Sequence, residues 1–339
     1  MGDFLIGKNW MYHLINEFNL INDTWEVFID KVAYNRGKDI FEISTYVDSV
    51  NCGYELLDDT NQYDVIIHFC IVPYIQYFAG EIVYYNNIEF GKYILRLMDF
   101  GFENYCMGFC RNPKFYSTIR KLMEKFPERK YHNLCDLFGN LGIQDEYSFS
   151  LSIEKDENEY LSSLGLLNNS FITINTGLNR DYNAVSSTRA WSIANWDRLA
   201  QLLKAKRSDI QIVQVGEKMQ DDCVIKADIN LNGKTSIDEA RILMKKALIH
   251  VDYDGGLVHV RHILNGGPSV ILFGPTNVFR HSYKENIGIR TSDCPEDCEW
   301  LTDKWLFECP KGYDKAICME SINPEYVCER IIDILDNIN

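Results

Sequence analysis

The second half of the chain alternates between strand patterns and helix patterns, and this alternation limits the fold more than any other feature. Residues 171–177 (FITINTG), 210–216 (IQIVQVG) and 268–274 (PSVILFG) are short apolar runs that end in glycine, which is typical of buried parallel strands. Residues 191–206 carry apolar side chains at helical spacing. Residues 235–247 open with Thr and Ser and have acids in the first turn and lysines in the last, as a helix dipole prefers. The pattern predicts an α/β fold with a parallel sheet covered on both faces. In such sheets ligands bind beyond the carboxyl ends of the strands, where the glycine loops fall.

The length of 339 residues predicts two domains rather than one core. We expect an N-terminal domain over residues 1–150, where short apolar runs precede a helical, aromatic-rich stretch. Residues 151–169 are polar and charged and are interpreted as a linker region. The C-terminal domain is predicted over 170–322. A terminal helix over 323–339 begins at Asn-Pro and repeats apolar residues at helical spacing.

The net charge of -15 argues against nucleic acid or an anionic membrane as the main partner, because both attract basic surfaces. The N-terminus lacks the basic and apolar regions of a signal peptide, and no apolar run reaches the ~18 residues of a spanning helix. We therefore expect a cytoplasmic protein with no membrane span. Its 11 cysteines are then expected to be reduced thiols or metal ligands.

The stretch HVDYDGGLVHVRHILNGGPSVILFGPT (250–276) places an acid, two glycines and a histidine at the end of one apolar run. If a helix begins just after Gly255 and Gly256, its unpaired N–H groups favour an anion, and the glycines let a phosphate approach the backbone. His259 lies within one turn and can donate to a phosphate oxygen, while Asp254 can accept from a sugar hydroxyl or hold the loop. The pattern predicts a site for a sugar nucleotide diphosphate. The alternative is an ordinary glycine turn beside a core histidine.

The pattern from Asp254 through His259, followed by PSVILFGPT, resembles the donor-site motif of glycosyltransferase family 9, the ADP-heptose heptosyltransferases. The resemblance extends upstream through TRAWSIANWDRLAQLL, IQIVQVGEK and LNGKTSIDEARILMKKA, and it covers roughly the C-terminal half. It implies a GT-B type fold with two Rossmann-like domains, each with a parallel sheet, of which the N-terminal one lies on the acceptor side. It also implies transfer of a heptose from ADP-heptose to a hydroxyl acceptor with inversion at the anomeric carbon, without a catalytic metal.

The resemblance also implies which residues contact the donor. Arg189 stands where the family usually has a lysine and is expected to pair with the diphosphate, with hydroxyl donors from Ser187 and Thr188 beside it. The alternative for Arg189 is a surface charge. The other expected contacts are Glu217 with the ribose, Lys234 and Thr235 along the adenine, and Asp254, Gly255, Gly256 and His259 with the rest of the donor.

The catalytic base in the family is the aspartate of a Gly-Asp pair that follows the first strand and opens the first helix. Gly2-Asp3 looks like this pair, and a helical pattern follows it, so Asp3 is the candidate base. The strand that precedes the pair in the family has no counterpart here, so we expect an N-terminal domain that is incomplete or rebuilt. The alternative for Asp3 is a terminal acid without a role, which leaves Asp39 and Asp48 as fallback candidates.

Four cysteines lie close together near the C-terminus, in a polar segment over 294–318. Two pairs of thiols in such a segment predict a closed structural site for iron or zinc, with Cys294, Cys298, Cys309 and Cys318 as ligands. The alternative is four unpaired reduced thiols. This segment looks like the tail of the bacterial autotransporter heptosyltransferases, which carry a four-cysteine iron site, modify serines on adhesins and form large oligomers.

The branch resemblance implies a protein serine as the acceptor and a homo-oligomer. A lipopolysaccharide core sugar is the alternative acceptor. A non-catalytic scaffold that binds a nucleotide sugar is an alternative from another class. A dehydrogenase ranks last, because no G-x-G-x-x-G follows an early strand.

Overall fold

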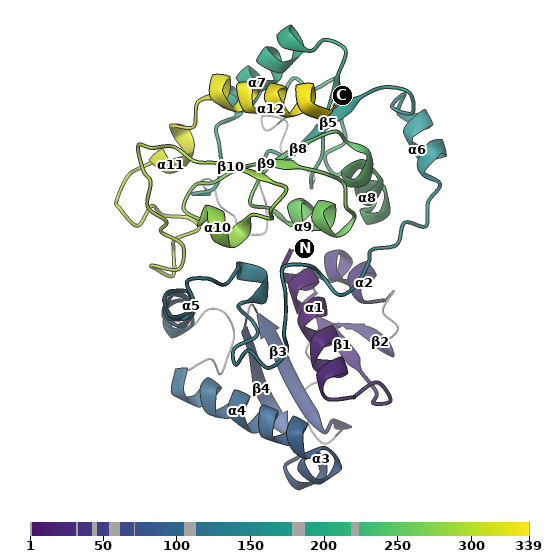
Figure 1. The fold of residues 1–339 in the computed structure, drawn as a ribbon, viewed down its shortest axis with the longest axis vertical. Coiled ribbons are helices and arrows are strands. Elements are labelled where there is room, and N and C mark those ends of the chain that lie inside the picture. The colour runs from purple at the N-terminus through teal and green to yellow at the C-terminus, as the bar shows by residue number, and fades with distance from the viewer. Residues whose placement is uncertain are drawn as a thin grey trace. The chain divides into compact units, whose positions relative to one another are not determined.

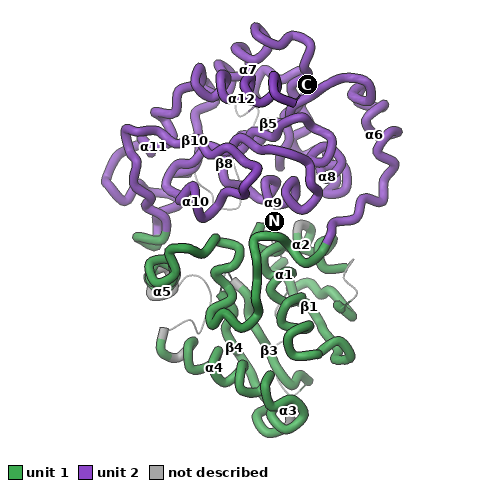
Figure 2. The backbone as a smooth tube through the Cα atoms, in the orientation of Figure 1, with its two compact units in different colours: residues 1–149, 300–303 green, residues 150–299, 304–339 purple. Residues whose placement is uncertain are grey.

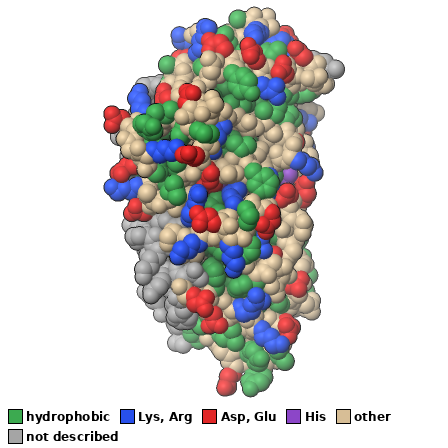
Figure 3. Space-filling model, turned by 60° about the vertical axis from the view of Figure 1, so that its left-hand side comes forward, with side chains coloured by type: hydrophobic (Ala, Val, Ile, Leu, Met, Phe, Trp, Pro, Cys, Tyr) green, Lys and Arg blue, Asp and Glu red, His purple; other side chains and the backbone are tan. Residues whose placement is uncertain are grey.

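The computed structural model describes residues 2–338 except 32, 43–45, 54–61, 71, 105–112, 178–186 and 218–223. The chain divides into two compact units, which Figure 2 distinguishes by colour: residues 1–149 with 300–303, and residues 150–299 with 304–339. Among the described helices, none is long and apolar enough to cross a membrane. Figure 3 shows acidic and basic side chains interspersed over the face that it presents.

The second unit is built on a six-stranded parallel sheet with the order β10-β9-β8-β5-β6-β7. Its strands are β5 (Phe171–Ile174), β6 (Gln211–Gln214), β7 (Ile229–Asn230), β8 (His250–Tyr253), β9 (Ser269–Leu272) and β10 (Ile287–Ile289). The chain runs from β5 outward to β7, then returns to place β8 on the other side of β5. This reversal is the topological switch point of a doubly wound sheet, where ligands bind.

Helices cover both faces of this sheet, as the alternating pattern predicts. In Figure 1, α7 (Ile193–Lys206) and α12 (Pro324–Ile338) lie on one face, and α8 (Ile237–Lys246) and α9 (Gly256–Ile263) lie on the other. The shorter helices are α6 (Glu157–Ser163), α10 (Val278–His281) and α11 (Ile317–Glu320). Trp196 and Leu199 of α7 pack with Val327 and Ile331 of α12 in one buried cluster that also holds strand residues. This burial of apolar side chains is the main stabilising term of the unit.

Arg261 of α9 joins three backbone segments of the second unit and is fully buried. Its Nη1 donates to the carbonyl of Met244 at 2.5 Å, and its Nη2 donates to those of Ala247 and Leu248 at 3.0 and 3.1 Å. Its Nε donates to the carbonyls of residues 267 and 268, both at 3.1 Å. Burial lowers the pKa of Arg261 to about 10. The guanidinium thus holds the end of α8 and the loop into β8 against the loop that leads into β9.

The first unit contains two separate two-stranded sheets within its described residues. Its strands are β1 (Glu26–Ile29) and β2 (Ser49–Cys52), which pair in parallel, and β3 (Val65–Cys70) and β4 (Val72–Phe78), which pair antiparallel. Its helices are α1 (Gly2–Glu17), α2 (Tyr34–Glu42), α3 (Glu81–Asn86), α4 (Ile88–Asn104), α5 (Pro113–Lys125) and the 3-10 turn η3 (Tyr131–Asn133).

The expectation of a parallel sheet in both domains is therefore wrong for β3 and β4. One residue separates these strands in the sequence. A parallel pair needs a crossover of about a dozen residues or more, so strands this close can pair side by side only as a hairpin.

Candidate functional site

The candidate site begins where β8 ends and α9 starts, at the switch point of the parallel sheet. Gly255 is the N-cap of α9, in an extended conformation, and no side chain caps the helix there. The helix begins at Gly256, one residue earlier than the sequence pattern predicts. An N-terminus without a capping side chain presents N–H groups and the positive end of the helix dipole. Together with two residues that lack a Cβ, this is a suitable surface for a phosphate.

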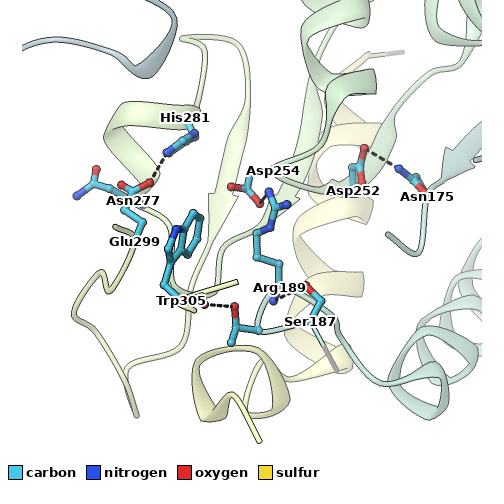
Figure 4. A network of polar contacts seen from close by, with 10 residues as sticks. Asn175, Ser187, Arg189, Asp252, Asp254, Asn277, His281, Glu299 and Trp305 are labelled. Atoms are coloured by element: carbon cyan, nitrogen blue, oxygen red, sulfur yellow. Dashed lines mark hydrogen bonds and ion pairs between the residues drawn. The ribbon is translucent and has the colours of Figure 1, made fainter. Parts of the chain in front are cut away.

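Arg189 and Asp254 form an ion pair at this helix start. Arg189 Nη1 lies 3.4 Å from Asp254 Oδ1, and the guanidinium lies over the Tyr253 ring at 5.3 Å from its centroid. Figure 4 shows the Arg189 side chain extending toward Asp254. The Asp254 side chain is 4% exposed and that of Arg189 24%. The structure thus brings together two predicted donor residues that are far apart in the sequence, and Asp254 holds the arginine.

Thr188 and Ser187 differ in what their hydroxyls do. The Thr188 hydroxyl donates to the Trp305 carbonyl at 2.8 Å, and the Thr188 N–H donates to the Leu306 carbonyl at 3.0 Å. The single proton of the Thr188 hydroxyl is thus used inside the protein, and the predicted contact of Thr188 with the donor stays a prediction. Ser187 Oγ accepts the Arg189 N–H at 3.2 Å, which leaves the Ser187 proton for another acceptor.

Glu217, Lys234 and Thr235 lie on the loops that follow β6 and β7. The Gly233 N–H donates to the Gly216 carbonyl at 2.8 Å, so the two loops are joined. Lys234 is exposed, and its Nζ donates to the Asn230 carbonyl at 2.9 Å. Thr235 is half-buried and Glu217 exposed.

Glu217 acts electrostatically on Tyr253, the last residue of β8. Burial raises the pKa of Tyr253, and the charges of Arg189, Asp254 and Glu217 act on the same hydroxyl.

The sequence pattern does not predict the buried polar chain that Asn175, Asp252 and His250 form. Asn175 Nδ2 donates to Asp252 Oδ2 at 3.2 Å, and Oδ2 lies 3.0 Å from His250 Nε2. Asn175 Oδ1 accepts the Gly177 N–H at 3.2 Å, so the chain joins the loops after β5 and β8. A Cβ on Gly255 would lie 3.0 Å from Asp252 Oδ2, which explains the glycine there. The available signal was an aspartate and a histidine in the otherwise apolar run LIHVDY.

The sequence pattern also does not predict the ion pair of His281 and Glu299, which follow β9 in the chain. His281 Nε2 lies 2.6 Å from Glu299 Oε2, and the Asn277 N–H donates to Glu299 Oε1 at 3.2 Å (Figure 4). Burial lowers the pKa of His281, but the Glu299 carboxylate outweighs it, so the pKa lies above the ordinary value. Asp254 and Arg189 also act electrostatically on His281.

Gly177 is a position where the backbone and a neighbour both require glycine, and it gives a matched test of the loop after β5. Its φ is +74°, and a Cβ would lie 2.2 Å from two carbons of the Tyr253 ring. Gly165 has a similar φ of +69° but no atom within 4 Å of a built Cβ. Gly177→Ala is expected to lower the free energy of unfolding by about 2–4 kcal/mol, and Gly165→Ala by about 1 kcal/mol. Denaturant unfolding measures both, and equal losses would contradict the close contact with Tyr253.

Asp3 lies in the first turn of α1, within the first unit, and its side chain is exposed. The residue therefore belongs to a helix of 16 residues rather than to a frayed end. The fallback candidates Asp39 and Asp48 lie in α2 and just before β2.

The four predicted metal ligands are neighbours in the second unit. Cys294, Cys298 and Cys318 are buried and Cys309 is half-buried. Burial raises the pKa of Cys318 to about 11, with further contributions from Cys294, Cys298 and Cys309. No group of three or more His, Cys, Asp or Glu side chains in the described part of the chain is arranged to hold a metal ion. The formed four-cysteine site that the sequence predicts is thus not seen among the described residues.

The cysteine segment is joined to the loop that follows β9. The Cys298 N–H donates to the Pro275 carbonyl at 2.7 Å. Arg290 Nη1 donates to the Thr276 carbonyl at 3.0 Å, and Arg290 Nε donates to the Cys294 carbonyl at 3.4 Å. The cysteine segment is therefore anchored to the loop that follows β9.

Comparison with known proteins agrees with this geometry. The family model described as glycosyltransferase family 9 (heptosyltransferase) matches residues 125–299, more than half of the chain. The chain therefore belongs to this family, and the predicted class of enzyme, a glycosyltransferase, is confirmed. No curated protein sequence matches.

Several solved structures are similar to the chain. A family 9 glycosyltransferase from Veillonella parvula is 16% identical over 99% of this chain and 94% of that one, with a TM-score of 0.55. The ADP-heptose lipopolysaccharide heptosyltransferase II of Escherichia coli is 14% identical over 99% and 96%, with a TM-score of 0.54. The dodecameric iron-containing heptosyltransferase TibC of enterotoxigenic E. coli is 13% identical over 63% and 55%, with a TM-score of 0.47. The first two show that the fold is that of the family.

Proposed function

We propose that this protein is an inverting glycosyltransferase that moves a heptose from ADP-heptose to a hydroxyl acceptor. One observation carries the proposal: the α9 start, without a capping side chain, lies beside the Arg189–Asp254 pair at the switch point of a family 9 domain. Backbone N–H groups, glycines and an arginine are the groups that bind a diphosphate.

The donor is proposed to bind with its diphosphate between the α9 start and Arg189. The phosphate oxygens would take over part of the arginine's hydrogen bonding, which frees Asp254 to accept from a sugar hydroxyl. Glu217 is proposed to contact the ribose, and Lys234 and Thr235 the adenine. As the bond from the anomeric carbon to the diphosphate breaks, negative charge grows on the leaving ADP. N–H groups and a fixed cation stabilise that charge.

Asp3 is proposed as the base of the reaction. Its carboxylate would take the proton of the acceptor hydroxyl while the acceptor oxygen attacks the anomeric carbon from the face opposite the diphosphate. One C–O bond forms, the C–O bond to the diphosphate breaks, and the anomeric configuration inverts. The place of Asp3 in the first turn of a helix supports this role, because a fixed carboxylate is a better base than one on a mobile end.

The proposed acceptor is a serine of an autotransporter-type protein, with a lipopolysaccharide core sugar as the alternative. The test incubates the enzyme with ADP-heptose and either a serine-rich adhesin fragment or purified core oligosaccharide, and follows the acceptor mass. A gain of one heptose residue on the peptide serines is expected. Asp3→Asn is expected to slow transfer by about 100-fold or more. Transfer to the core alone would select the alternative acceptor, and ADP binding without transfer to either would favour a non-catalytic scaffold.

We further propose that Cys294, Cys298, Cys309 and Cys318 bind one structural iron or zinc ion, and that the protein forms a homo-oligomer. The support for the ion is the mutual proximity and low exposure of the four thiols. Metal binding would remove the protons that burial favours, so it should strengthen as the pH rises.

Elemental analysis of the purified protein tests the ion directly. We expect about one equivalent of iron or zinc per chain, as one tetrathiolate site requires, and its loss in Cys318→Ser. The matched control is Cys52→Ser, because Cys52 is exposed and belongs to the first unit. Metal-free wild-type protein, or equal metal in Cys318→Ser, would contradict the site. Light scattering of the same samples gives the oligomer size.

A further inference from the structure

Tyr283 lies just after α10 and is buried. The side chain is 5% exposed, and its ring stacks on that of His262 with centroids 3.6 Å apart and an interplanar angle of 6°. His262 is itself fixed, because its Nδ1 lies 2.7 Å from Glu285 Oε1. The position of the Tyr283 hydroxyl is therefore set by a packed ring rather than by a mobile side chain.

The Tyr283 hydroxyl contacts the histidine of the donor motif. Its oxygen lies 2.5 Å from His259 Nδ1, and the two rings are close to perpendicular, at 87°. A phenol is a much stronger acid than a neutral imidazole N–H, and an imidazole nitrogen is a much stronger base than a phenol oxygen. The favoured arrangement is therefore the one in which the tyrosine O–H donates and His259 Nδ1 accepts.

The other nitrogen of His259 then carries the proton. His259 lies three residues after Gly256, the first residue of α9, so both lie on the same face of the helix. Side chains on a helix lean toward its N-terminus, which brings the imidazole toward the start of α9. A donor N–H at Nε2 is what a phosphate oxygen at that helix start requires.

We infer that Tyr283 is a positioning residue that holds His259 in the Nε2–H tautomer, so that the imidazole donates to the sugar nucleotide's phosphate. The inference rests on the proposed donor site. In the opposite tautomer the lone pair on Nε2 would face the phosphate, and the two would repel each other. Tyr283 would thus act on the affinity for the nucleotide without touching the nucleotide.

The test combines a spectroscopic measurement with a binding measurement. Nitrogen NMR of the full chain with labelled histidine, assigned by comparison with His259→Gln, reports which nitrogen of His259 carries the proton in the absence of any ligand. Tyr283→Phe keeps the ring and its stack on His262 but removes the hydroxyl. We expect the Nε2–H tautomer in the wild type, a mixture of tautomers in Tyr283→Phe, and ADP affinity about 5-fold lower in that variant, as loss of one hydrogen bond predicts.

A double-mutant cycle with His259→Gln separates this role from packing. Glutamine places its amide nitrogen near the position of Nε2 and has no tautomer to select, so Tyr283→Phe should cost little affinity in that background. An Nδ1–H tautomer in the wild type would overturn the inference, and so would an unchanged tautomer in Tyr283→Phe. Absence of ADP binding by the wild type would contradict the proposed function instead, and the NMR result would still decide the tautomer.

Discussion

Replacement of Arg261 by methionine is expected to lower the free energy of unfolding by about 3–5 kcal/mol. Methionine fills much of the same volume, so the loss reports hydrogen bonding more than an empty cavity. The arginine donates to five backbone carbonyls from a fully buried position, and the variant leaves these acceptors without their partner. Denaturant unfolding followed by circular dichroism measures the change.

Two further variants make this result specific. Arg261→Lys keeps the positive charge but replaces the planar guanidinium, which reaches several carbonyls at once, with a single ammonium group. Its loss of unfolding free energy should therefore be close to that of Arg261→Met. Arg198→Met removes an exposed ion pair with Glu325 at 2.8 Å and should cost less than about 1 kcal/mol. If Arg261→Met and Arg198→Met lower the free energy of unfolding equally, Arg261 does not hold the α8 and α9 connections together.

Replacement of Arg189 by glutamine is expected to weaken ADP binding by about 10- to 100-fold. A hydrogen bond from a charged group contributes about 1.5–3 kcal/mol, and Arg189 is the cation that the structure places beside the α9 start. The variant also leaves Asp254 without its charged partner, so the local field becomes less favourable for an anion. Calorimetric titration measures the affinity.

Arg189→Lys is the informative companion, since the family resemblance predicts a lysine at this position. It retains the positive charge and should keep affinity within about 10-fold of the wild type. Arg198→Gln, which changes the net charge equally but lies elsewhere in the second unit, should have no effect. Equal affinities for wild type and Arg189→Gln would show that the diphosphate binds elsewhere or not at all.

Periodicity and glycine placement predict several strands and helices of the second unit. The strands ending near Gly177 and Gly216 and the helix over 191–206 are short-range patterns, and they recur as β5, β6 and α7. The loop carrying Asp254 was found in the same way. These features depend on neighbours in the sequence, so they can be read without a structure.

Features that depend on distant pairings could not be predicted in the same way. The hydroxyl of Thr188 is used by the Trp305 carbonyl, a residue more than a hundred positions away. Asp252 and Asn175 come from different strands that meet only when β5 and β8 pair. The hairpin of β3 and β4 differs, because the sequence pattern predicts no strand over residues 72–78 and so offers no hairpin partner for β3.

We propose that the start of α9 binds the diphosphate of an adenine nucleotide. Calorimetric titration of the wild-type full chain with ADP, UDP and GDP tests this proposal. We expect saturable binding of ADP that is about 10-fold or more tighter than that of either other nucleotide, a difference of about 1.4 kcal/mol. No binding of any nucleotide, or equal affinity for all three, would contradict it.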